Sequence, residues 1–227
     1  KDRRKINECL DYINKNAKKP FKGYEVDVND KKQFIIVIEQ IIKEYHQIDA
    51  LINNQIIMPQ FNSNNNLYRP EKYPLKLWKK TLRNNLTSIF LTCQQIGKVM
   101  LNNNKGVILN VIPTNYLQDL IPLTYDQKKY SNANLFPIDF AVAKASVINF
   151  TRYIATYWAK NNIRANCLVQ GGLLKENDQA NTTKVEKIGL NRFANHDEYI
   201  GSLLFLISDA SSYMTGSVLV VDGCHTA

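Results

Sequence analysis

The sequence predicts an α/β fold: a doubly wound parallel sheet with helices on both faces, in three layers. Strand patterns alternate along the chain with helical patterns of ten or more residues, such as those at 76–103 and 139–160. The segment from Gly106 to Val111 is a continuous apolar run, which is typical of a parallel strand buried on both faces. Together the two observations favour a parallel sheet.

The expected elements follow one another in a regular order. Ile6, Leu10 and Ile13 recur at helical spacing in the first element, and Asn29 or Asp30 can cap the second helix. Helices are expected at 4–17, 31–46, 76–103, 139–160 and 196–208. Strands are expected at 24–28, 49–54, 106–111, 163–169 and 217–221, with loops at 55–76 and 113–138 and a polar segment at 174–190.

A single domain spanning 1–227 is the expected organisation. The 227 residues are enough to bury a sizeable core, and the sequence shows neither an internal repeat nor a second-domain boundary. Hydrophobic residues make up 44% and charged residues 22%, which is ordinary for a soluble globular protein. No apolar run reaches about 18 residues, so no transmembrane segment is predicted.

Charge and cysteine content narrow the choice of partners. The net charge is +9, but the basic residues are spread, so a solvated lysine-rich surface is favoured over a nucleic-acid or anionic-membrane site. The four cysteines and three histidines are scattered, so no metal site is expected. Free thiols fit a reducing intracellular compartment, either the cytoplasm or an organellar matrix such as the mitochondrial one. The chain begins at Lys1, so an upstream segment is expected, and a cleaved organellar presequence stays open.

Five segments, in chain order, resemble the short-chain dehydrogenase/reductase family. They are Asp27-Val28, 49–54, Asn85-Leu86-Thr87, 144–166 and 209–223. In the family, the first of these segments ends the third strand and the second is the fourth strand with its asparagines. The third lies in the long central helix, the fourth in the catalytic helix and the strand after it, and the fifth is the C-terminal signature. The resemblance covers essentially the whole chain and implies a Rossmann-like fold.

The resemblance also implies where an oxidoreductase site would lie. In the family a Tyr hydroxyl exchanges a proton with the substrate, and a Lys one turn later lowers the pKa of that Tyr and holds the nicotinamide ribose. Lys144 and Asn85 match that lysine and the asparagine of the long helix. Asp27, Asn53 and Gly171, with Lys144, match positions that contact the cofactor.

The chain departs from the family at several chemical positions. Phe140 stands where the family has its tyrosine, and it carries no proton that it could exchange. Pro113 matches the position of the serine that polarises the substrate oxygen, and Gln170 replaces the proline before Gly171. The family's first strand, its glycine-rich loop and its second strand, about thirty to forty residues of one β-α-β unit, have no counterpart in the chain.

Alternatives remain for both the lost and the retained groups. Thr114, or Tyr125 or Tyr130 from the following loop, is an alternative source of a hydroxyl. Lys144 can instead extend its ammonium group to water or pair with a carboxylate. Asn85 can instead satisfy buried backbone groups, and these structural interpretations are favoured over catalytic ones.

The correlated departures lead to a prediction of a degenerate, non-catalytic member of the family. It would act as a structural or interaction subunit of a larger assembly, forming a homodimer or hetero-oligomer through helices 76–103 and 139–160. No cofactor is expected for the chain as given. The alternative is an NAD(P)-dependent short-chain oxidoreductase acting on a sugar or nucleotide-linked sugar, with an upstream glycine-rich segment. A third hypothesis is salt-sensitive binding of a polyanion to the basic surface.

Overall fold

The computed structural model describes residues 3–16, 20–57, 70–114, 137–173 and 185–227. By its internal contacts the chain forms two compact units, Lys1–His46 and Gln47–Ala227. Each unit is described by itself. The organisation as one domain over 1–227 stays a prediction from the sequence.

The first unit contains two helices, α1 (Arg3–Asn16) and α2 (Lys31–Tyr45). As expected from the sequence, Asp30 caps α2: its side chain accepts hydrogen bonds from the backbone N–H groups of Lys32 and Gln33 at 3.1 and 3.2 Å. The helix ends at His46, which adopts a left-handed conformation with φ 67°. Both predicted helices of this part of the chain are therefore confirmed.

The strand predicted at 24–28 is wrong. The segment runs without regular structure into a turn, in which Asp27 O accepts from Asp30 N at 2.8 Å. Asp27 Oδ1 accepts from Asn29 N at 3.0 Å, so its side chain competes for the backbone donors that a strand would use. A strand also needs a neighbour, and the described residues of the first unit contain no other strand.

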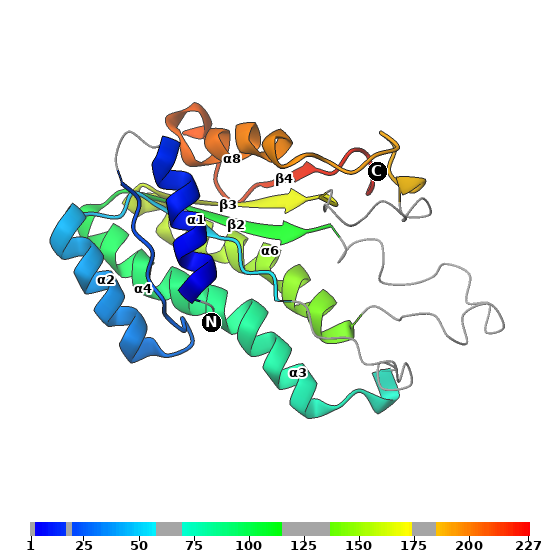
Figure 1. Ribbon diagram of the computed structural model, residues 1–227, viewed down its shortest axis with the longest axis horizontal. Coiled ribbons are helices and arrows are strands. Elements are labelled where there is room, and N and C mark those ends of the chain that lie inside the picture. Colours follow the sequence, from blue (N-terminus) through cyan, green and yellow to red (C-terminus); the bar gives the residue numbers. More distant parts are fainter. Residues whose placement is uncertain (1–2, 17–19, 58–69, 115–136, 174–184) are drawn as a thin grey trace. The chain divides into compact units, whose positions relative to one another are not determined.

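The second unit is built on a four-stranded, fully parallel sheet (Figure 1). Its strands are β1 (Ala50–Asn53), β2 (Gly106–Pro113), β3 (Ile163–Gln170) and β4 (Val218–Val221), hydrogen-bonded in that order. The register pairs Asn53 with Asn110 and Pro113 with Gln170, so the carboxyl ends of the strands lie at one edge. The predicted parallel α/β sheet is confirmed.

Helices cover both faces of this sheet. On one face lie α3 (Leu75–Leu82), α4 (Ser88–Asn103) and α6 (Ile138–Trp158), and on the other lies α8 (Ile200–Ile207) (Figure 1). A π-helical segment, η3 (Arg83–Thr87), joins α3 to α4. Short 3-10 turns occur at Pro70–Lys72, Ala159–Asn161, His196–Tyr199 and Asp209–Ser211. The result is three layers.

Side chains alternate along β2 between the two faces of the sheet. Leu109 and Val111, with Leu168 of β3, form a buried cluster against Leu206 of α8. The intervening Asn110 faces the opposite helices, since its side-chain amide donates to Thr151 Oγ1 of α6 at 2.8 Å. This alternation decides which residues at the end of β2 can face α6.

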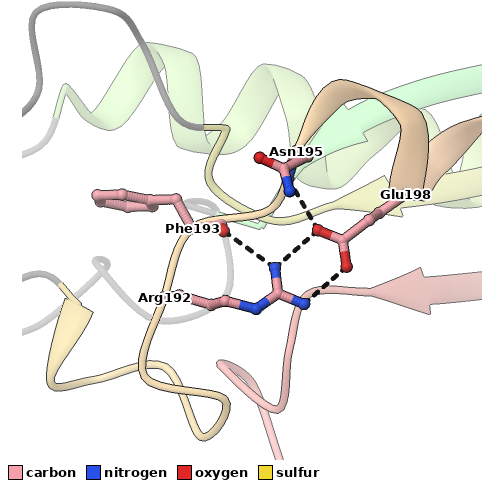
Figure 2. Close-up of polar contacts among 4 residues, drawn as sticks. All are labelled: Arg192, Phe193, Asn195 and Glu198. Atoms are coloured by element: carbon pink, nitrogen blue, oxygen red, sulfur yellow. Dashed lines mark hydrogen bonds and ion pairs between the residues drawn. The ribbon is translucent and has the colours of Figure 1, made fainter.

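The connection into α8 is held by the Arg192–Glu198 pair (Figure 2). The two Arg192 terminal nitrogens each donate to one Glu198 carboxylate oxygen at 2.7 Å, and Glu198 Oε2 also accepts from the backbone N–H of Asn195 at 2.8 Å. Asn195 and Glu198 together form a capping box at the start of the 3-10 turn. The hydrogen bonds from Arg192, followed by that from Asn195, lower the pKa of Glu198 to about 2.

Candidate active site

Two of the residues singled out by their resemblance, Asn85 and Lys144, meet at the carboxyl end of β1. In open α/β sheets this edge is where ligands bind. Asn85 comes from η3 and Lys144 from α6, and both contact the segment from Gln55 to Ile57 that follows β1. Side chains from two helical segments therefore bond the backbone of the three residues that follow β1.

Asn85 is fully buried, and its side chain holds Ile57 from both sides. Asn85 Oδ1 accepts from Ile57 N at 3.1 Å, and Nδ2 donates to Ile57 O at 2.8 Å and to Thr81 O at 3.2 Å. The helix widens at this point, since the backbone N–H of Ser88 donates to Arg83 O, five residues earlier. The π-helical segment thus lies where the side chain of Asn85 joins the helix to the end of β1.

Lys144 is also fully buried, and Nζ donates a hydrogen bond to the backbone carbonyl of Gln55. The Nζ atom lies 5.6 Å from the centroid of the Phe140 ring, one helical turn earlier on α6. Burial lowers the pKa of Lys144 to about 8. Near pH 8, therefore, the protonated and the neutral form of the Lys144 side chain are both present.

Phe140 is fully buried beside this ammonium group. Its backbone N–H donates to Oδ1 of Asp139 at 2.7 Å. Asp139 is itself fully buried, and its second oxygen, Oδ2, accepts no hydrogen bond from the described residues. No role was predicted for Asp139 from the sequence.

Pro113 is the last residue of β2 and lies opposite Gln170 in the register. The backbone N–H of Thr114 continues this pairing, since it donates to Gln170 O at 2.9 Å. Thr114 is the first residue after β2 and lies in a turn. Thr114 is 1% exposed, so its hydroxyl lies inside the protein near the carboxyl edge of the sheet. Tyr125 and Tyr130 lie outside the described residues.

Asn53 takes part in a buried polar network that ties the sheet to α4 and α6. Asn53 Nδ2 donates to Asn110 Oδ1 at 2.8 Å, and Asn53 Oδ1 accepts from the hydroxyl of Thr92 at 2.7 Å. Asn110 in turn donates to Thr151. The side-chain amide of Asn53 is thus used within the protein, and what it offers at the strand end is its backbone.

Gly171 follows β3 and donates its backbone N–H to Val221 O at 2.9 Å. A Cβ atom at this position would lie 2.7 Å from the Cα of Asp222, so a glycine is required for the ends of β3 and β4 to approach. Asp27, the remaining residue expected at the cofactor, belongs to the first unit and forms the turn described above.

Groups at the carboxyl edge fit a nicotinamide nucleotide. An ammonium group carries three N–H donors, and the hydrogen bonds among the described residues use one of those on Lys144. The buried side-chain oxygen of Gln55, Oε1, also has no hydrogen-bond partner among the described residues. Ribose hydroxyls and the nicotinamide carboxamide are ligands that such donors and acceptors bind. The sequence predicts no role for Gln55 or Ile57, because only tertiary contacts bring them to Lys144 and Asn85.

Two absences hold for the described part of the chain. It contains no group of three His, Cys, Asp or Glu residues that could hold a metal ion. Within it, too, each helix is too short or too polar to cross a membrane.

Several curated proteins are similar to this chain over most of its length. The NAD-dependent glycerol dehydrogenase of Listeria innocua is 28% identical over 212 residues, which is 89% of this chain and 74% of that protein. The 3-oxoacyl-[acyl-carrier-protein] reductase of Thermotoga maritima is 30% identical over 205 residues, 88% of this chain and 75% of that protein. The 2-dehydro-3-deoxy-D-gluconate 5-dehydrogenase of Pseudoalteromonas atlantica is 26% identical over 211 residues.

These relatives contradict the prediction of a non-catalytic interaction subunit, because they are named as dehydrogenases and reductases. The leaning away from an enzyme and the expectation of no cofactor are corrected by the same finding. The physical error lay in the weight given to Phe140. A missing proton donor slows one step by about 10²–10⁴, but it leaves the fold and the buried lysine and asparagine in place.

A family model described as enoyl-(acyl carrier protein) reductase matches residues 2–226. The crystal structure of a short-chain type dehydrogenase/reductase from Mycobacterium marinum superposes with a TM-score of 0.80 at 24% identity, covering 98% of this chain and 82% of that one. That likeness concerns the fold, and the sequence matches extend over nearly the same residues. The chain therefore belongs to the short-chain dehydrogenase/reductase family.

Proposed function

We propose that this chain is an NAD(P)-dependent oxidoreductase that interconverts a hydroxyl and a carbonyl group on a sugar, a nucleotide-linked sugar or a polyol. One observation carries the proposal: Asn85 and Lys144, from two different helices, are both buried and both hydrogen-bond the segment 55–57 at the carboxyl edge of the sheet. Relatives named for glycerol, threitol, glucose and a deoxygluconate support the polyol and sugar class.

The proposed roles follow from the positions of the side chains. The bound nicotinamide nucleotide supplies or accepts the hydride. Lys144 would hold the ribose hydroxyls with the donors that Gln55 does not use, and Asn85 would fix the strand end that borders the site. Asn53, through its backbone, and Gly171 are proposed as further cofactor contacts. Asp27 belongs to the first unit, so its contact with a cofactor stays a prediction from the sequence.

The chain is proposed to be an atypical member, since Phe140 and Pro113 stand at the positions of the family's tyrosine and serine. Neither side chain can donate or accept a proton. Thr114 is the described hydroxyl nearest in sequence to Pro113, and it is buried at the carboxyl edge of the sheet. It is therefore proposed as the group that polarises the substrate oxygen.

The test uses the full-length gene product, titrated with NADH and NADPH by protein fluorescence and then assayed with polyols, sugars and their oxidised forms. Binding in the micromolar range and a measurable rate of nucleotide oxidation or reduction are expected. Lys144→Ala should weaken binding by at least tenfold, whereas Lys105→Ala, at an exposed lysine before β2, should not. Failure of both nucleotides to bind the wild-type protein would refute the proposal.

A second copy of the chain is proposed to dock on α4 and α6, the helices expected to form an interface. Their outer surface carries two aromatic pairs: Phe90 with Phe150, edge to face, and Tyr153 with Tyr157, stacked, each with 6.1 Å between ring centroids. Tyr153 and Tyr157 are 69% and 70% exposed. Exposed aromatic rings in such a cluster are favourable for burial in an interface.

Sedimentation velocity tests the dimer. A double change of Tyr153 and Tyr157 to serine should weaken self-association by at least tenfold, while Tyr213→Ser, at a fully exposed tyrosine away from these helices in the sequence, should leave it unchanged. A wild-type protein that sediments as a monomer at micromolar concentrations would contradict this proposal and leave the oxidoreductase proposal standing.

A reducing intracellular compartment is proposed as the place of this activity, in the cytoplasm or an organellar matrix. Cys93 and Cys167 are buried free thiols, and Cys224 is a free thiol at the surface. A surface thiol that stays unpaired favours a reducing environment.

A further inference from the structure

Reduction of a carbonyl requires a proton as well as a hydride, and Phe140 cannot provide it. Another proton donor would have to be a titratable group near the Phe140 ring. Lys144 and Asp139 are both on α6 and both fully buried, and Lys144 Nζ is 5.6 Å from the ring centroid.

The surroundings of Lys144 Nζ favour a group that exchanges protons. Its described hydrogen-bond partner is the neutral carbonyl of Gln55, so no ion pair within the described residues fixes its positive charge. The ring of Phe140 forms an apolar wall on one side. An amine held in an apolar, desolvated place loses its proton more readily than an amine in water.

The elements packed around Lys144 contribute few charges. From β3, the thiol of Cys167 is the titratable group whose charge couples to Lys144, and burial raises the pKa of that thiol to about 12, so it is neutral near pH 8. From η3, Asn85 is polar and uncharged. From α6 itself, Asp139 is the acidic group, five residues earlier, and its Oδ1 accepts a hydrogen bond from Phe140 N.

We propose that the Lys144 side chain itself donates the proton to the substrate oxygen during reduction and takes it back during oxidation. This role rests on the proposed oxidoreductase function. In reduction, one N–H bond of the ammonium group breaks and an O–H bond forms on the substrate oxygen, while the carbonyl carbon gains a hydride. The two electrons come from the reduced nicotinamide nucleotide. The neutral amine regains its proton from solvent.

The acidity of Lys144 agrees with this geometry. Its pKa, lowered to about 8 by burial, lies near the pH at which a proton donor works best. The ammonium form is the acid, so reduction should be fast below about pH 8 and fall tenfold per pH unit above it. Oxidation needs the neutral amine and should rise over the same range.

The experiment compares the wild type with Lys144→Arg in single-turnover reduction of a carbonyl substrate by NADH or NADPH between pH 6 and 10. Arginine keeps the positive charge but does not release its proton in this range. We expect Lys144→Arg to bind the nucleotide within about threefold of the wild type, to react at least 100-fold more slowly and to lose the pH dependence. A lysine that only positions the cofactor would leave the pH dependence in place.

A second measurement needs no turnover. In protein labelled with ¹³C at the lysine ε-carbons, the Lys144 resonance, absent from Lys144→Arg, should titrate near pH 8. A pKa near the ordinary value of about 10.4 would overturn the inference. So would a rate of Lys144→Arg within tenfold of the wild type. If the wild type binds neither nucleotide, the proposed function falls and this inference falls with it. If Lys144→Arg binds the nucleotide and turns over with the pH profile of the wild type, only the proton-transfer role of Lys144 is refuted, and the proposed function stands.

Discussion

Asn85 and Ile57, 28 residues apart, are joined by two hydrogen bonds that pair both polar atoms of the side-chain amide with both backbone groups. Oδ1 accepts from Ile57 N at 3.1 Å, and Nδ2 donates to Ile57 O at 2.8 Å. The amide therefore does for the end of β1 what a neighbouring strand would do. It fixes the same short segment of backbone to which the Lys144 ammonium group donates a hydrogen bond, at Gln55 O.

Asn85→Asp should destabilise the protein by about 1–3 kcal/mol, because a carboxylate cannot donate to Ile57 O and Thr81 O and leaves buried carbonyls unsatisfied. Equilibrium unfolding in urea measures the change. Asn102→Asp, at an exposed position of α4, is the matched control and should stay within about 0.5 kcal/mol. Equal effects of the two changes would contradict the role of Asn85.

Phe140→Tyr should raise the rate of the proposed reaction by about 10²–10⁴, since it places an ionisable hydroxyl on the helical turn before the Lys144 ammonium group. Steady-state rates with NADH or NADPH measure the gain. Phe150→Tyr, on the same helix but in the outer aromatic pair, should leave the rate unchanged. No gain at position 140 would show that proton transfer does not limit the reaction.

Thr151→Val should cost about 1–3 kcal/mol of stability. The Thr151 hydroxyl accepts from Asn110 Nδ2 at 2.8 Å within the buried network, and valine leaves that donor unpaired. Thr156→Val is a close control, because both threonine hydroxyls donate to the carbonyl four residues earlier, but Thr156 is exposed. Urea unfolding should show the loss at position 151 and a change of about 0.5 kcal/mol or less at position 156.

Gly97→Ala should destabilise the contact between α4 and α6, because a Cβ atom would lie 2.5 Å from the Trp158 ring. Overpacking of this kind costs about 1–3 kcal/mol. Gly201→Ala, in α8, meets no atom within 4 Å and should instead stabilise the protein by about 0.5–1 kcal/mol. Thermal melts of the two variants should therefore shift in opposite directions, and shifts of the same sign would contradict the packing at Gly97.

The Arg192–Glu198 pair predicts a dependence of stability on pH (Figure 2). The pKa of Glu198 is lowered to about 2 in the folded chain, so the carboxylate stabilises the fold above the unfolded pKa of about 4.3. That contribution is lost as the pH falls towards 2. The difference in Tm between the wild type and Glu198→Gln should thus be largest above pH 5 and shrink below pH 4. A difference that is constant down to pH 2.5 would exclude the linkage.

Lys144 and Asn85 could be proposed as site residues from the sequence, but their contacts could not be predicted. Lys144 and Asn85 were identified by the motifs that surround them, and the fold places both at the carboxyl edge of the sheet. Their partners, Gln55 and Ile57, carry no sequence signal, since the bonds go to backbone groups 89 and 28 residues away. The departure at Phe140 was given too much weight, because a sequence motif does not show which other groups lie near the reacting atoms.

The sequence by itself determined the order of strands and helices in the second unit and the cap of α2 at Asp30. These features depend on local periodicity and on hydrogen bonds between residues a few positions apart. Only the tertiary structure decided that 24–28 is no strand, because a strand needs a neighbour as well as a suitable sequence. The acidity of Lys144 was likewise decided by burial against Phe140 and β3, and burial depends on contacts between distant parts of the chain.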